Sequence, residues 1–138
     1  MTIDCETEQP GEYRQALRIR SHTLHADVLE AAGGHDSAPG AHDYFDAALA
    51  VCKTHTALWY AKKNGIPLER VESHVTRDDS QERSGKYVLS VRLALHGPMT
   101  DEQRARIYAA VSRCPIHKLM TTSEVVIETA PLDAEPEV

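Results

Sequence analysis

Alternation of apolar and polar residues predicts β-strands in three parts of the chain. Residues 13–28 alternate in part and predict two short strands with a turn near Ser21. Residues 70–76 and 86–96 alternate more regularly, and the charged, glycine-terminated link between them is typical of a hairpin loop. Near the end of the chain, the run EVVIET at 124–129 predicts one last strand.

A long helix is predicted between these strands. Residues 41–64 contain neither Gly nor Pro and are rich in Ala, Leu and Lys, which favours a helix of about six turns. Gly65 and Pro67 then stop it. The segment AALAVC at 47–52 is apolar nearly all round, and a surface helix would not tolerate this pattern. We therefore expect this helix to run through the core or an interface.

Two further helices are predicted in the last third of the chain. Thr100, followed three residues later by Gln103, forms a capping-box pattern that begins the first of them. Cys114 and Pro115 open the second, which extends to about Met120, because Pro fits the first helical position, where a missing N–H costs nothing.

The order β-β-α-β-β-α-α-β contains no regular βαβ alternation. It therefore favours an α+β fold with a mostly antiparallel sheet. We expect one domain over residues 12–130. The polar, acidic ends at 1–11 and 131–138 are predicted to be flexible tails.

Composition and charge exclude several kinds of partner. With 138 residues and a net charge of -6, the protein lacks the clustered Lys and Arg that binding to nucleic acid or anionic lipid requires. No stretch approaches the ~20 apolar residues that cross a bilayer, and the N-terminus carries acids where a secretory signal carries bases. We therefore expect a cytoplasmic protein. Three cysteines are unlike a disulfide framework and indicate reactive, metal-binding or merely buried thiols.

Cys52 and Cys114 occupy different electrostatic settings. Cys114 is predicted at a helix N-terminus, where free N–H groups and the helix dipole favour the nucleophilic thiolate. Cys52 lies in an apolar helix, where burial disfavours the thiolate unless a cation or hydrogen-bond donors compensate. Local sequence alone therefore favours Cys114 as the nucleophile and leaves Cys52 open as a simple core residue.

Each of these cysteines is followed three residues later by a histidine, His55 or His117, on the same helix face. This spacing suits a Cys-His ion pair, or a Cys2His2 metal site if the two segments meet. The separation of Cys52 and Cys114 excludes a local CxxC motif but allows a disulfide if the fold brings them together.

Two motifs resemble the OsmC/Ohr family of peroxide-stress proteins. They are HDYFDAALAVCKTHTALWYAKKNGIPLERV and MTDEQRARIYAAVSRCPIHKLM, and the similarity extends from about residue 24 to 129, closer to the general OsmC-like branch than to the Ohr branch. The resemblance implies an intertwined homodimer, with a β-sheet on each side of central cysteine-bearing helices. It also implies that Cys52 attacks a peroxide oxygen to become a sulfenic acid, that Cys114 condenses with it to a disulfide, and that a dithiol, such as a dihydrolipoyl group or a small thiol, reduces this disulfide.

The resemblance also implies an Arg and a Glu beside the attacking thiol. His42 stands at the position of the usual Glu, and Asp43 is the nearest substitute. Arg18 and Arg20, from the N-terminal strands, are the candidates for the Arg. We further assign His42, Phe45 and His117 to substrate binding.

The leading hypothesis is therefore a peroxidase that reduces organic hydroperoxides without a cofactor or a metal, since an apolar helix around Cys52 suits an alkyl tail. The alternative is a non-catalytic OsmC-like protein for redox sensing or ligand binding, in which the two cysteines form a switchable disulfide. A metal-binding variant that uses the Cys-x-x-His pairs is the third possibility.

Overall fold

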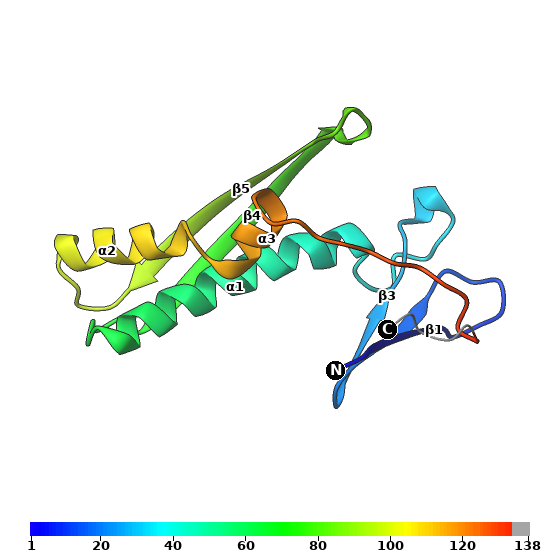
Figure 1. Ribbon diagram of the computed structural model, residues 1–138, viewed down its shortest axis with the longest axis horizontal. Coiled ribbons are helices and arrows are strands. Elements are labelled where there is room, and N and C mark those ends of the chain that lie inside the picture. Colours follow the sequence, from blue (N-terminus) through cyan, green and yellow to red (C-terminus); the bar gives the residue numbers. More distant parts are fainter. Residues whose placement is uncertain (134–138) are drawn as a thin grey trace.

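The computed structural model describes residues 1–133, which fold into two antiparallel sheets and three α-helices (Figure 1). The elements, in chain order, are β1 (Ile3–Thr7), β2 (Gln15–Ile19), β3 (His22–Ala26), the short helix η1 (Glu30–Ala32), α1 (Ala41–Lys63), β4 (Arg70–Gln81), the short helix η2 (Glu82–Ser84), β5 (Lys86–His96), α2 (Asp101–Val111) and α3 (Pro115–Thr121). The expected α+β class is confirmed.

Helix α1 begins at the predicted residue and ends at Lys63, one residue before the predicted end. At its start, the Asp43 carboxylate accepts a hydrogen bond from the Gly40 amide at 2.8 Å, so that one free N–H of the first turn is satisfied. Lys62 and Lys63 lie in the last turn, where cations complement the helix dipole. Gly65, with φ of 64°, then turns the chain away.

Strands β4 and β5 form a long hairpin that packs on α1 (Figure 1). Pairing runs from Arg70 opposite His96 to Gln81 opposite Lys86, so β4 is longer than the predicted 70–76. The additional residues are polar and exposed, and the alternation of apolar residues that would reveal a strand is missing there. The hairpin's far end is therefore held by backbone pairing rather than by burial.

The N-terminal sheet contains a strand where we expected a flexible tail. The sheet order is β1-β2-β3, and Cys5 of β1 pairs with Leu17 of β2. Every residue of β1 is exposed, so no buried face marks this strand in the sequence. The two strands predicted within 13–28 are confirmed as β2 and β3, which turn at Arg20 and Ser21.

The connection between β3 and α1 is ordered by one buried carboxylate. Asp27 accepts hydrogen bonds from the Ser37 hydroxyl at 2.6 Å and from the amides of Ser37, Val28 and His35. The Ser37 bonds, led by the hydroxyl, hold the pKa of Asp27 well below its usual range. Asp27 is therefore the reason that this link has a defined path.

The core lies between α1, the hairpin and α2. Its fully or nearly buried members are Ala57, Ala61, Ile66, Leu95, Ile107 and Val111. Small Ala side chains on α1 allow α2 to approach closely, and Ile107 fills the space between them without any exposed surface. This packing fixes the place where α2 ends and the segment with Cys114 begins.

The strand predicted at 124–129 is wrong. Within residues 1–133, this segment pairs with no strand, and Val125, Val126 and Ile127 are exposed. It runs from the end of α3 toward the N-terminal sheet (Figure 1). Residues 134–138 of the predicted C-terminal tail lie outside the described part of the chain, and the single-domain boundaries of 12 and 130 stay a prediction. No helix within residues 1–133 is both long and apolar enough to cross a membrane.

Candidate active site

The fold brings Cys52 and Cys114 together from segments that are far apart in sequence. Cys52 lies on α1 and is partly exposed, whereas Cys114 is fully buried at the residue that precedes α3. The Ile116 amide in the first turn of α3 donates a hydrogen bond to the Cys52 sulfur at 3.4 Å. The two side chains are also close enough for Cys52 to affect the pKa of Cys114, and both cysteines are free thiols. The structure therefore contains the thiol pair that a disulfide requires.

The surroundings of Cys114 favour the protonated thiol. Burial is the main cause and raises the pKa of Cys114, and the neighbouring Cys52 adds to the increase. The His117 amide and the Lys53 ammonium act in the opposite direction, but burial outweighs them. The expectation from local sequence that Cys114 is the better nucleophile is therefore not supported, because a helix N-terminus cannot compensate for complete burial.

Lys53 is a site residue that the sequence analysis missed. Its side chain is buried, with the whole residue only 6% exposed. The ammonium donates a hydrogen bond to the Val111 carbonyl at 3.0 Å and contacts Nδ1 of His117 at 3.1 Å. The available signal was a single Lys directly after the apolar run at 47–52 and next to Cys52, but the direction of its side chain cannot be read from the linear sequence.

Cys52 opens onto a pocket of about 1190 Å³ along α1. Its walls are mostly apolar or aromatic, and Trp59 and Tyr60 contribute to them. Arg113, the residue before Cys114, also lines this pocket, as does His55. Arg113 is thus the arginine that shares a pocket with Cys52, and the sequence analysis did not select it.

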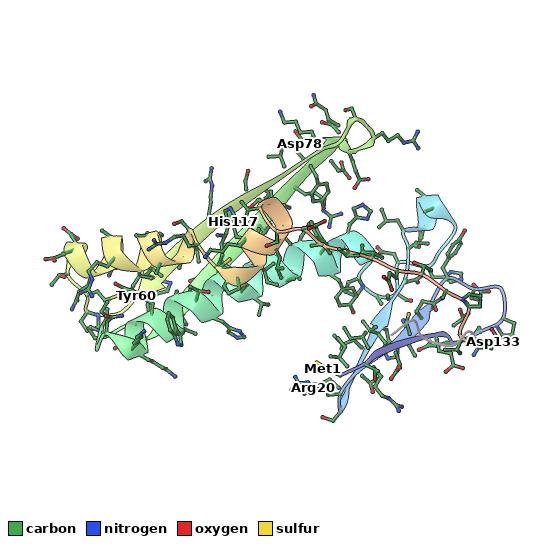
Figure 2. The ribbon with its side chains drawn as sticks, viewed as in Figure 1. Met1, Arg20, Tyr60, Asp78, His117 and Asp133 are labelled. Carbon is green, nitrogen blue, oxygen red and sulfur yellow. The ribbon has the colours of Figure 1, made fainter. Side chains whose placement is uncertain are left out.

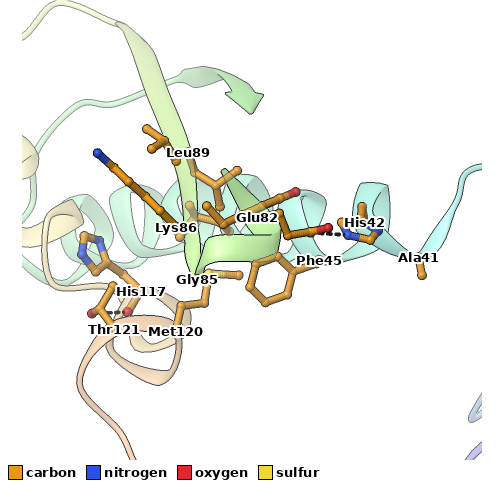
Figure 3. Close-up of a pocket in the computed structure, with 13 residues that line it drawn as sticks. Ala41, His42, Phe45, Glu82, Gly85, Lys86, Leu89, His117, Met120 and Thr121 are labelled. Atoms are coloured by element: carbon orange, nitrogen blue, oxygen red, sulfur yellow. Dashed lines mark hydrogen bonds and ion pairs between the residues drawn. The ribbon is translucent and has the colours of Figure 1, made fainter. Parts of the chain in front are cut away.

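The three predicted substrate-binding residues meet in a different pocket. His42, Phe45 and His117 line a hollow of about 860 Å³ between α1, the β4–β5 hairpin and α3, which Figure 3 shows in close-up. Cys52 does not line it. His42 contacts the Glu82 carboxylate at 2.6 Å, so its ring is already engaged at the rim of this hollow.

Asp43, the predicted substitute for the family's Glu, forms its hydrogen bonds with Gly40 and Arg77 and not with Cys52. Its carboxylate accepts hydrogen bonds from the Gly40 amide and from Arg77, and both bonds lower the pKa of Asp43. Arg77 also bonds Asp46 at 2.6 Å. The Tyr87 hydroxyl donates to Asp46 at 2.7 Å, and burial together with this bond raises the pKa of Tyr87 to about 12. The cluster fastens the hairpin to the first turns of α1.

Arg18 and Arg20 do not lie at the thiol pair within this chain. Both are exposed, Arg18 on β2 and Arg20 in the turn that follows it, with φ of 55°. Figure 2 shows Arg20 at the outer end of the N-terminal sheet, well separated from His117.

A Cys2His2 metal site is not formed. His55 is exposed in the pocket beside Cys52, while His117 contacts Lys53 and lines the other pocket, to which neither Cys52 nor His55 contributes. Within residues 1–133, no three His, Cys, Asp or Glu side chains are grouped so that they could hold a metal ion.

These features define a small α+β protein with two neighbouring cysteines. One is partly exposed on the long helix α1, and the other is buried at the start of the short helix α3. The family model for OsmC-like protein matches residues 34–130. Because this match covers more than half of the chain, the protein belongs to the OsmC-like family.

Solved structures agree with this assignment. An osmotic stress and detoxification response protein of Psychrobacter arcticus has 16% identity and a TM-score of 0.73, with 88% of this chain and 89% of that chain covered. An OsmC-like protein of Mycoplasma pneumoniae has 17% identity and a TM-score of 0.69, with 88% and 89% covered. The organic hydroperoxide resistance protein OhrB of Bacillus subtilis has 20% identity and a TM-score of 0.56, with 88% and 92% covered. At such identities the structures establish the fold alone. No curated protein matches the chain.

Proposed function

We propose that this protein is a thiol-dependent peroxidase that reduces organic hydroperoxides through Cys52 and Cys114. The observation that carries the proposal is the pairing of an accessible thiol with a buried one, joined by the contact of the Ile116 amide with the Cys52 sulfur. The substrate class is supported by fold relatives such as the Bacillus subtilis organic hydroperoxide resistance protein.

The reaction begins at Cys52, because only this thiol of the pair is partly exposed and lines a pocket. Its thiolate attacks the terminal peroxide oxygen, the O–O bond breaks, and the alkoxide takes a proton and leaves as an alcohol. Cys52 is then a sulfenic acid. The Ile116 amide, already directed at the sulfur, stabilises negative charge on the thiolate before attack.

Cys114 completes the oxidation. Its sulfur attacks the Cys52 sulfenic acid, the S–O bond breaks, and the hydroxide takes a proton and leaves as water. A dithiol reductant then reopens the disulfide by two exchange steps, which return both cysteines to thiols.

The pocket beside Cys52 supports a substrate with an apolar tail. Its lining includes the aromatic rings of Trp59 and Tyr60, which can cover hydrocarbon. Arg113 lines the same pocket and is positioned to take the role that the family resemblance gives to an arginine, namely holding the peroxide oxygens. In this proposal Arg113, and not Arg18 or Arg20, is the arginine that holds the peroxide.

We also propose the intertwined homodimer that the family resemblance implies. On α1, Val51 and Trp59 both line the pocket of Cys52 and expose 51% and 59% of their surface, which is unusual for large apolar residues on one side of a helix. The N-terminal sheet extends away from one end of α1 (Figure 1), where the Tyr44 hydroxyl donates a hydrogen bond to the His25 carbonyl of β3. A second copy that covers this face of α1 would bury these side chains.

The test is hydroperoxide consumption with dihydrolipoamide as the reductant. Cumene hydroperoxide and hydrogen peroxide are compared for the wild type, Cys52→Ser and Cys114→Ser, with Cys5→Ser as the matched control because Cys5 lies on β1. We expect faster turnover of cumene hydroperoxide, loss of turnover in Cys52→Ser, and no change in Cys5→Ser. Absence of turnover by reduced, folded wild type would refute the peroxidase.

One observation favours a second candidate function. His42 occupies the position where the resemblance expects Glu, and it contacts Glu82 rather than the thiol pair. A redox sensor without turnover would need only the Cys52–Cys114 disulfide. This alternative predicts stoichiometric disulfide formation with peroxide, followed by no catalytic consumption.

A further inference from the structure

Lys53 is an ionisable side chain buried without a carboxylate partner. Its residue is 94% removed from solvent, and among residues 1–133 no Asp or Glu lies within salt-bridge distance of its ammonium. Its two contacts are the Val111 carbonyl and a ring nitrogen of His117. Burial of an ammonium is energetically unfavourable unless an anion compensates it. Lys53 therefore requires an anion that the described carboxylates do not supply.

The groups around Lys53 point to the thiol pair. The Val111 carbonyl that accepts from the Lys53 ammonium also accepts from the Cys114 amide, at 3.3 Å. The Lys53 ammonium and the Cys114 amide thus donate to the same carbonyl oxygen. Lys53 also acts electrostatically on the Cys114 thiol in the direction that favours the anion.

We propose that Lys53 is an electrostatic positioning residue for disulfide formation, whose buried ammonium stabilises the Cys114 thiolate as it attacks the oxidised Cys52. The inference rests on the proposed peroxidase function and adds a residue to it. The thiolate is the missing counter-ion, present only while the pair reacts. Before and after that step, the Val111 carbonyl and His117 hold the ammonium.

The step balances in atoms and electrons. Cys114 loses its thiol proton, its sulfur forms a bond to the Cys52 sulfur, and the S–O bond of the sulfenic acid breaks. The departing hydroxide combines with one proton to form water. The Cys114 sulfur is oxidised by one electron and the Cys52 sulfur is reduced by one, so no further oxidant is required. Lys53 keeps its proton throughout and acts through its charge.

Other groups near Cys114 do not supply this charge. Cys52, on α1, disfavours the Cys114 thiolate, and the His117 amide on α3 favours it as a dipole. The His117 ring faces Lys53 and accepts its hydrogen bond when Nδ1 is unprotonated. α2 contributes a carbonyl, which is negative at its oxygen. Among the groups within residues 1–133 that act on the Cys114 thiol, Lys53 is accordingly the cation, and its removal takes away a positive charge that favours the thiolate.

The experiment separates the two steps of the reaction. In a Cys5→Ser background, the reduced protein is mixed with one equivalent of cumene hydroperoxide, and sulfenic acid formation and disulfide closure are timed across a pH series. We expect Lys53→Met to slow disulfide closure about tenfold at neutral pH, because a nearby cation lowers the pKa of a thiol by about one unit or more. The rise of the closure rate with pH should also occur at higher pH in this variant. Lys53→Arg should restore much of the rate. Profiles that coincide with those of the wild type would overturn the inference.

A matched control and a second neutral variant distinguish the loss of the Lys53 charge from damage to the fold. Lys62→Met removes an exposed cation from the same helix and should leave closure unchanged. Lys53→Gln removes the charge but keeps a hydrogen-bond donor for the Val111 carbonyl. It should be slow like Lys53→Met, and a wild-type rate in Lys53→Gln would show that Lys53 serves only as a donor.

A separate titration keeps this inference distinguishable from the proposed function. The ultraviolet absorbance of the thiolate is followed with pH in Cys5→Ser/Cys52→Ser, where Cys114 is the one cysteine left, with and without Lys53→Met. The inference expects the Cys114 titration to move to higher pH in the variant, whether or not the protein consumes peroxide. An unmoved titration refutes the role of Lys53 while leaving the peroxidase intact.

Discussion

Ile107→Ala tests whether the packing of α2 on α1 holds the segment with Cys114 in place. Ile107 is completely buried in the core that α1, the hairpin and α2 share. Its neighbours on α1 are Ala57 and Ala61, which have no side-chain atoms that could move into the vacated space. The substitution therefore leaves a cavity rather than a collapsed core.

The expected magnitude follows from the atoms that are removed. Shortening Ile to Ala takes three carbons out of the core, about 2.4 kcal/mol at about 0.8 kcal/mol for each. The cavity adds roughly 1 to 2 kcal/mol because its walls are supported by helices on both sides. We expect a loss of about 4 kcal/mol in the free energy of unfolding. Ile107→Val removes one carbon and should cost about 1 kcal/mol.

The assay is urea unfolding under reducing conditions, followed by far-ultraviolet circular dichroism at one fixed protein concentration. Ile107→Val is the matched control, and the slope of the transition should be unchanged in both variants. A loss below about 1 kcal/mol in Ile107→Ala would refute the reasoning, since it would mean that the site relaxes and that α2 is not held firmly against α1.

Two further predictions concern the loop before α1 and the exposed face of α1. Asp27→Asn should lower the melting temperature at neutral pH. Because native hydrogen bonds lower the pKa of Asp27, its contribution is present above the ordinary Asp pKa and is lost as pH falls through the native value. The difference in melting temperature from the wild type should therefore shrink in acid, and a pH-independent difference would contradict this assignment. For the proposed homodimer, sedimentation velocity should show a wild-type dimer that Val51→Arg converts to monomer, whereas Leu29→Arg, at an exposed apolar residue on the loop beside η1, should remain dimeric. A monomeric wild type at the same concentration would refute the dimer.

The sequence predicted those elements whose signals are local. The boundaries of α1 depend on a run without Gly or Pro that ends at Gly65, and the start of α2 depends on the capping box of Thr100 and Gln103, which the structure contains. In the segment at 124–129, by contrast, the apolar run EVVIET satisfies the local preference for a strand. It has no neighbouring strand within residues 1–133, and pairing is a property of the fold rather than of the segment.

The candidate site was predicted only in part, for the same physical reason. The two cysteines could be selected because each stands in a recognisable helical setting, and the structure brings them together. The contact between the Ile116 amide and Cys52 spans 64 residues, and so does that between Lys53 and His117, so neither is visible in a local pattern. Arg113 was missed because its place in the pocket of Cys52 depends on how α2 leads into α3.

If the protein is the proposed peroxidase, the asymmetry of the two thiols explains how it would reduce a peroxide without losing its own site to oxidation. A sulfenic acid that meets a second peroxide is oxidised further and irreversibly, so the disulfide must close first. Cys114 is fully buried and is therefore protected from peroxide, yet it lies beside the sulfur that it must attack. Burial alone would keep Cys114 protonated and slow. In the proposed mechanism, the buried Lys53 ammonium, which shares the Val111 carbonyl with the Cys114 amide, opposes that effect without exposing Cys114 to the pocket that we assign to the peroxide.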